Sequence, residues 1–153
     1  MSAQTLAGEF LRILQADAEN FPPNEIYLSL DEDERLKPHD EEGDEAFRPV
    51  SLTIGVSVQP LDDAGQLFSY RLTLTIMSHG YDVTAVEHGE WVETVRRVFF
   101  GPGAKAAIAT AMDDGGLFEL RGYDRGNSDQ LDPSIDSGQL VTAFTIRGMA
   151  LLV

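Results

Sequence analysis

Several residues that could act as acids, bases or metal ligands lie close together in the stretch SHGYDVTAVEHGEWVETVRR, residues 78–97. They are His79, Asp82, Glu87, His88, Glu90 and Glu93, with Trp91 among them. Histidine and carboxylate side chains are common zinc ligands, and a histidine can also transfer protons near neutral pH. A small-molecule or divalent-ion site near His79, Asp82 and His88 is therefore one interpretation of this stretch.

The element that must position these residues is a helix that begins inside the stretch. Thr84 and Glu87 have the T-x-x-E spacing of a capping box, in which they occupy the N-cap and N3 positions. The pattern predicts a helix from about residue 85 to residue 99 or 100, which Gly101 and Pro102 end. Glu87 is then used by the cap rather than by a ligand.

The helical spacing also gives His88 a structural explanation. His88 lies on the same apolar face as Trp91, where a histidine is more often packed and hydrogen-bonded than bound to a metal. His79 is expected in an exposed turn before the helix, and the stretch contains no H-E-x-x-H pair of zinc ligands. Glu93 and Arg97 are expected to form an i,i+4 ion pair on the exposed side of the helix.

Other motifs that carry chemistry are missing or incomplete. A calcium loop starting at Asp31 would need an oxygen ligand at its fifth position and glycine at its sixth, where the chain has Arg35 and Leu36. The segment FGPGAK, residues 100–105, lacks the spacing of a phosphate loop, and no G-x-S-x-G elbow occurs. The chain has no cysteine. We therefore expect neither an enzyme nor a protein that carries a metal or another cofactor.

The charge of the chain is strongly negative and unevenly distributed. Its 153 residues carry a formal net charge of −15. Residues 31–45 hold nine acids and two bases, a net −7, and residues 113–138 hold seven acids and two bases, a net −5. Such a surface repels phosphate groups, so nucleic-acid binding through a basic patch is not expected. The acidic segment 31–47 is interpreted as a loop that is either simply solvated or attracts a basic partner.

No membrane-spanning or secretory segment is recognisable. The chain lacks the run of about 18 apolar residues that a membrane helix needs. Its beginning, MSAQTLAGEFLRILQ, lacks the basic region of a signal peptide. These features, together with the absence of cysteine, favour a protein that is not secreted and that lies in the cytoplasm or in a virion.

Strict alternation of apolar and polar residues marks two long strands. The alternation covers residues 50–59 and 68–77, and PLDDAGQ at 60–66 supplies a turn between them. The pair is expected to form a long antiparallel hairpin with one face in the core. Its polar face could meet solvent, another subunit or the inside of a tube.

Helices and shorter strands surround this hairpin. The sequence predicts helices at 3–18, 85–100 and 103–113, strands at 25–30, 117–123 and 139–153, and loops at 31–47 and 124–138. This order predicts an α+β fold: a mixed, mainly antiparallel sheet with a long central hairpin, packed by an N-terminal helix and two central helices. No repeat or long linker divides the chain, so a single domain, residues 1–153, is expected.

In the order of its elements the chain resembles bacteriophage tail-terminator and tail-completion proteins. The resemblance rests on the strands VSLTIGVSVQP and FSYRLTLTIMS and on the helix TAVEHGEWVETVRRVFF, and it extends to the first helix and the last strands. It covers most of the chain without a diagnostic motif, and the loops 31–47 and 124–138 have no counterpart in the family pattern. It implies a small structural protein without an active site. Its copies would form a ring, commonly a hexamer, that caps the tail tube and joins it to the head.

The resemblance implies three kinds of partner: further copies of the chain, tail-tube proteins and head–tail connector proteins. A ring subunit needs strand edges and apolar contact surface, which the apolar end MALLV could supply. The candidate interface residues are Asp31, Glu32, Asp33, Glu34, Glu41, Glu42, Met149, Leu151, Leu152 and Val153. The alternative function is a soluble adaptor or inhibitor that binds a basic protein through residues 31–47, with an affinity that falls steeply as salt rises.

Overall fold

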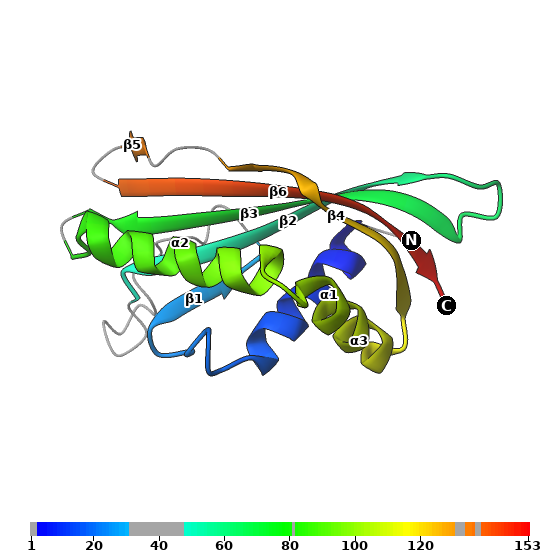
Figure 1. The fold of residues 1–153 in the computed structure, drawn as a ribbon, viewed down its shortest axis with the longest axis horizontal. Coiled ribbons are helices and arrows are strands. Elements are labelled where there is room, and N and C mark those ends of the chain that lie inside the picture. Colours follow the sequence, from blue (N-terminus) through cyan, green and yellow to red (C-terminus); the bar gives the residue numbers. More distant parts are fainter. Residues whose placement is uncertain (1–2, 31–47, 81, 131–133, 137–138) are drawn as a thin grey trace.

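The computed structural model of the chain describes residues 3–30, 48–80, 82–130, 134–136 and 139–153. Over these residues the chain forms a sheet with three helices on one of its faces (Figure 1). The helices are α1 (Ala3–Ala16), α2 (Ala85–Phe100) and α3 (Ala104–Gly115). The strands are β1 (Ile26–Ser29), β2 (Val50–Pro60), β3 (Leu67–His79), β4 (Phe118–Gln130), β5 (Ser134–Asp136) and β6 (Gln139–Leu152). The expected α+β fold is confirmed.

The sheet is mixed and mainly antiparallel, as the sequence predicts. Its strands lie in the order β1-β2-β3-β6-β4, and β5 pairs with β6. β1 is parallel to β2, and the other pairs are antiparallel. β2 and β3 form the long hairpin, in which Val50 lies opposite Ser78 and Pro60 lies opposite Phe68. β6 lies between β3 and β4. The last strand of the chain therefore joins β4 to the part of the sheet that the earlier strands form.

The hydrophobic core fills the space between the sheet and the helices. Alternation places every second strand residue on this side, so that Leu72 of β3 lies between Val56 of β2 and Ile146 of β6. α1 contributes the apolar stripe that its sequence predicts. Fully buried side chains of the core include Leu6, Phe10 and Leu14 of α1, Val95 and Phe99 of α2, Met112 of α3, and Leu52, Leu72, Leu74, Phe144 and Ile146 of the sheet.

The other face of the sheet carries mostly polar side chains. Among the described residues no helix lies on it, and Figure 1 shows α1, α2 and α3 together on the opposite side. We call it the helix-free face. By the strand register it presents Ser57 of β2, Ser69, Arg71, Thr73 and Thr75 of β3, and Ala143, Thr145, Arg147 and Met149 of β6. The polar strand face predicted from alternation is therefore confirmed.

The predicted polar loop at 124–138 is wrong over much of its length, because β4 and β5 occupy most of it. Its many turn-forming residues suggested a loop, but the backbone pairs with β6. Asp124 lies opposite Arg147, and Gln130 lies opposite Phe144. Two register shifts interrupt this pairing. A bulged strand at the edge of a sheet needs no regular apolar alternation, so its sequence resembles that of a loop.

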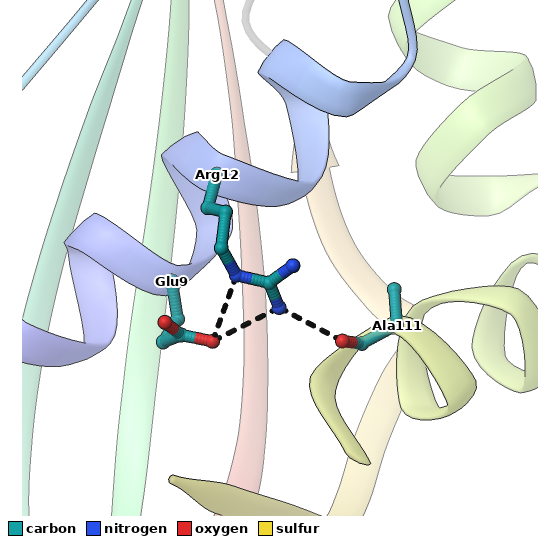
Figure 2. Close-up of polar contacts among 3 residues, drawn as sticks. All are labelled: Glu9, Arg12 and Ala111. Carbon is teal, nitrogen blue, oxygen red and sulfur yellow. Dashed lines mark hydrogen bonds and ion pairs between the residues drawn. The ribbon is translucent and has the colours of Figure 1, made fainter. Parts of the chain in front are cut away.

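A hydrogen bond from Arg12, whose guanidinium is also ion-paired with Glu9 within α1, fastens α1 to α3 (Figure 2). Arg12 Nη2 donates to Glu9 Oε2 at 3.0 Å and to the backbone carbonyl of Ala111 at 2.9 Å. Glu9 is only 8% exposed. The guanidinium therefore neutralises a buried carboxylate and also satisfies a carbonyl near the C-terminal end of α3, where positive charge is favourable.

We expect Arg12→Ala to lower the free energy of unfolding by about 2 kcal/mol, because Glu9 would stay buried without its cation. Urea unfolding followed by circular dichroism measures the change. Lys105→Ala is the matched control, since Lys105 is exposed on α3, and its expected effect is below about 0.5 kcal/mol. Equal small effects of the two substitutions would contradict a structural role for Arg12.

Candidate functional site: an acidic groove beside Trp91

Two adjoining hollows form a groove between α2 and the connection from α1 to β1. The first has a volume of about 270 Å³, and the second, of about 310 Å³, extends towards the start of β2. Glu25, Glu87 and Trp91 line both hollows. We call the whole the acidic groove because five carboxylates surround its tryptophan. They are those of Glu19, Glu25, Asp82, Glu87 and Glu90.

The wall of the groove that faces α2 is the turn after α1, and polar contacts fix its position. Asn20 Nδ2 donates to Asp17 Oδ2 at 2.8 Å, which closes a turn directly after α1. Arg97 of α2 donates to Asn20 Oδ1 and so ties this turn to the helix. The expected ion pair of Glu93 with Arg97 is therefore wrong, because Arg97 reaches across to the turn and Glu93 pairs with Arg96.

The first turn of α2 forms the other wall. Thr84 Oγ1 accepts a hydrogen bond from the backbone N–H of Glu87 at 3.2 Å, as the capping box predicts. The same hydroxyl donates to Glu87 Oε1 at 3.1 Å, which holds this carboxylate at the rim of the groove. Val86 beside it is 73% exposed. The helix cap thus places a fixed negative charge next to an apolar side chain in solvent.

The groove has the chemistry of a site for a cationic side chain. Its five carboxylates are exposed, and the half-buried ring of Trp91 lies among them. Carboxylates bind guanidinium and ammonium groups, and the face of an indole ring attracts cations as well. Metal binding is a different matter. Within the described part of the chain, no three histidine, aspartate or glutamate side chains are grouped so that they could hold a metal ion.

His88 points away from the groove into a buried polar cluster. Its Nδ1 lies 2.6 Å from Ser78 Oγ on β3, and its Nε2 lies 2.8 Å from Thr142 Oγ1 on β6. All three residues are at most 2% exposed. A serine beside a histidine can be an activated nucleophile, but this hydroxyl is enclosed and meets no solvent. The cluster therefore fastens α2 to the two central strands.

Burial of the His88 ring lowers its pKa from the ordinary value of 6.5. The folded protein therefore favours the neutral imidazole, with one nitrogen donating and the other accepting a hydrogen bond. A neutral ring suits the two hydroxyl partners, since each hydroxyl can either donate or accept.

The ligand site interpreted near His79, Asp82 and His88 is not assembled. His79 Nδ1 lies 3.1 Å from Asp82 Oδ2 in the turn, while both ring nitrogens of His88 face buried hydroxyls. The local explanation by cap, turn and packed histidine is confirmed. What the sequence pattern missed is the contribution of Glu19 and Glu25. These residues join the groove through the packing of the connection before β1 against α2, which no local spacing reveals.

The acidic candidate interface residues Asp31, Glu32, Asp33, Glu34, Glu41 and Glu42 lie outside the described residues. The apolar candidates belong to β6 or follow it directly, so they do not form a free tail. Met149 and Val153 are 42% and 76% exposed, and Leu151 lies on the helix-free face opposite Leu67. Leu152 instead packs against the hydrophobic core.

No family model and no curated protein matches this chain. Functional inference therefore depends on two features: the acidic groove and the helix-free face. In addition, no helix among the described residues is long and apolar enough to cross a membrane.

Proposed function

We propose that the chain is a structural assembly subunit whose copies close into a ring, as the tail-terminator and tail-completion proteins of bacteriophages do. Its partners would be further copies of the chain, with a hexamer as the expected ring, together with tail-tube or head–tail connector proteins. Its place would be the virion or the cytoplasm of a bacterial host. This function needs no active site, cofactor or metal.

The observation that supports the proposal most is the composition of the helix-free face. A polar sheet face is ordinary in an antiparallel sheet, but this one combines polar residues with apolar ones. Leu67, Met149 and Leu151 lie together on adjacent strands, and Met149 is 42% exposed. Arg71 and Arg147 lie directly beside them. Methionine and arginine are enriched in protein interfaces, so this mixture favours contact with another protein.

The arrangement of the strands also suits assembly. Among the described strands, none pairs with the outer edge of β1 or of β4. The end of the β2–β3 hairpin projects beyond the helices (Figure 1). Unpaired edges and projecting hairpins can add to a sheet of a neighbouring subunit.

The mass of the full chain in solution tests the proposal. Light scattering on a sizing column, over a series of concentrations, should give one discrete oligomer. Six chains of 16.8 kDa would give about 100 kDa. A monomer at every concentration would contradict the ring, and a mass that grows continuously with concentration would indicate open filaments instead.

A second candidate function is an acidic adaptor or inhibitor that binds a basic protein. The acidic segment 31–47, which suggested this function, lies outside the described residues. The five carboxylates of the acidic groove also favour binding of a basic partner. This candidate is expected to be a monomer or a dimer that binds a lysine-rich peptide, with an affinity that falls as salt rises. Fluorescence of Trp91, the one tryptophan of the chain, reports such binding directly.

A further inference from the structure

A third feature of the molecule is a pocket of about 250 Å³ beside the edge strand β1. Figure 1 shows β1 joined to the end of α1 by the connection that forms one wall of this pocket. We call it the Arg48 pocket, and it shares no lining residue with the acidic groove. None of the described residues that line it is acidic, although the chain has a net charge of −15. They include Gln15, Phe21, Ile26, Tyr27, Leu28 and Arg48.

Arg48 is the cation of this pocket. Its guanidinium carbon lies 5.4 Å from the centre of the Tyr27 ring, whose face attracts the charge. Its Nε is buried without a hydrogen-bond partner, and none of the ion pairs among the described residues includes Arg48. Buried donors usually have a partner, because an unpaired one costs free energy. Arg48 as a whole is only half-buried and carries five N–H donors, so it can bind an acceptor that enters the pocket.

The other walls of the Arg48 pocket suit an apolar group. Phe21 and Ile26 are each 1% exposed, so they give the pocket a fixed apolar wall. Leu28 of β1 is half-buried and packs against the hydrophobic core. A molecule with its negative charge at Arg48 can therefore place hydrocarbon against these side chains. The volume lies below the roughly 300–1,000 Å³ of sites for drug-sized ligands, so the molecule must be small.

We propose that the Arg48 pocket binds a small monocarboxylic acid, with the carboxylate on the guanidinium of Arg48 and the hydrocarbon part against Phe21 and Leu28. A guanidinium binds a carboxylate through two parallel hydrogen bonds. The amide of Gln15, which also lines the pocket, can donate a further one. One arginine balances one negative charge, and the net charge of −15 disfavours a dianion such as phosphate. The proposal is independent of the ring function and goes beyond it.

Titration of the isotopically labelled full chain with phenylacetate and with hexanoate, followed by NMR, tests the site. At least one of these acids should cause a saturable shift of the amide signals of residues 15, 21, 26–28 and 48, with a Kd of about 1 mM or lower. Phenylacetamide keeps the ring without the charge, and acetate keeps the charge without the ring. Each should bind at least about tenfold more weakly than phenylacetate, because each lacks one of the two contacts.

Substitution of Arg48 tests the anion contact itself. Arg48→Gln should raise the Kd for the acid at least about tenfold, because the amide carries no charge. Arg48→Lys should raise it less, since lysine keeps the charge but not the two parallel donors. Lys105→Gln is the control, because Lys105 is exposed on α3 and does not line the pocket, and its Kd should equal that of the wild type.

Circular dichroism of each variant confirms folding and so separates the outcomes. Saturable binding that Arg48→Gln weakens and Lys105→Gln does not would support the site. Equal binding of phenylacetate and phenylacetamide, or signal shifts confined to other parts of the chain, would overturn it. So would the absence of a saturable shift with either acid up to about 20 mM. If Arg48→Gln did not fold, the comparison of phenylacetate with phenylacetamide on the wild type would carry the test.

Discussion

Gly148→Ala is expected to lower the free energy of unfolding by about 3–4 kcal/mol, a large effect for the addition of one methyl group. A Cβ at Gly148 would lie 2.6 Å from Tyr70 Cζ, and closer still to the Tyr70 hydroxyl and to the backbone carbonyl of Gly122. Gly148 lies opposite Tyr70 in the register of β3 and β6, so the tyrosine ring covers the glycine. The crowded atoms belong to the backbone and to a buried ring, and neither can move cheaply.

The hydrogen bond of Tyr70 increases this cost. Its hydroxyl donates to the backbone carbonyl of Gly122 on β4 at 3.1 Å. Burial raises the pKa of Tyr70 far above its ordinary value, so the hydroxyl stays protonated and remains a donor. A methyl group on Gly148 would therefore break this hydrogen bond or displace β4 from β6.

Urea unfolding of Gly148→Ala, compared with Gly55→Ala, measures the effect. Gly55 also lies within a strand, but it is exposed, and a Cβ there would have no atom within 4 Å. The expected change for Gly55→Ala is within about 0.5 kcal/mol. If both alanine variants had the same urea midpoint as the wild type, the close approach at Gly148 would have no effect on the free energy of unfolding.

His88→Leu should lower the free energy of unfolding by about 3 kcal/mol at neutral pH. The leucine would leave Ser78 Oγ and Thr142 Oγ1 buried without the ring nitrogens that they now face. Each unpaired hydroxyl costs on the order of 1–3 kcal/mol, and the gain from burying an apolar side chain offsets part of that loss.

The effect of His88→Leu should also depend on pH. Because burial lowers the pKa of His88 below 6.5, the unfolded chain binds a proton at His88 more readily than the folded protein does. The contribution of the neutral ring to stability is fully present above pH 6.5 and is lost as pH falls through the folded pKa. The stability gap between wild type and variant should therefore narrow as the solution is acidified. A gap that stays constant from about pH 8 to 5 would contradict this role.

His79→Gln is the matched control for the pH experiment. His79 is half-exposed and contacts Asp82 in the turn before α2. Its loss leaves the buried cluster of Ser78, His88 and Thr142 intact. The narrowing attributed to His88 should therefore persist in the His79→Gln background.

Features that depend on neighbouring residues could be predicted from the sequence. Alternation predicted the hairpin of β2 and β3, and the spacing of Thr84 and Glu87 predicted the cap of α2. Features that depend on distant residues could not. The partner of Arg97 is Asn20, far away in the chain, and the edge strand β4 has the composition of a loop. The acidic groove could not be predicted either, because Glu19 and Glu25 join it only through tertiary packing.

The central place of β6 has a consequence for the synthesis of the protein. β3 leaves the ribosome well before β6, yet its whole length, from Leu67 to His79, pairs with β6 in the finished sheet. Until β6 emerges, the nascent chain carries a long, unpaired strand edge along the β3 side of the hairpin. Such edges attract other chains, and pairing over long sequence distances is slow. The nascent chain is therefore most exposed to aggregation in the interval before residues 139–152 emerge from the ribosome.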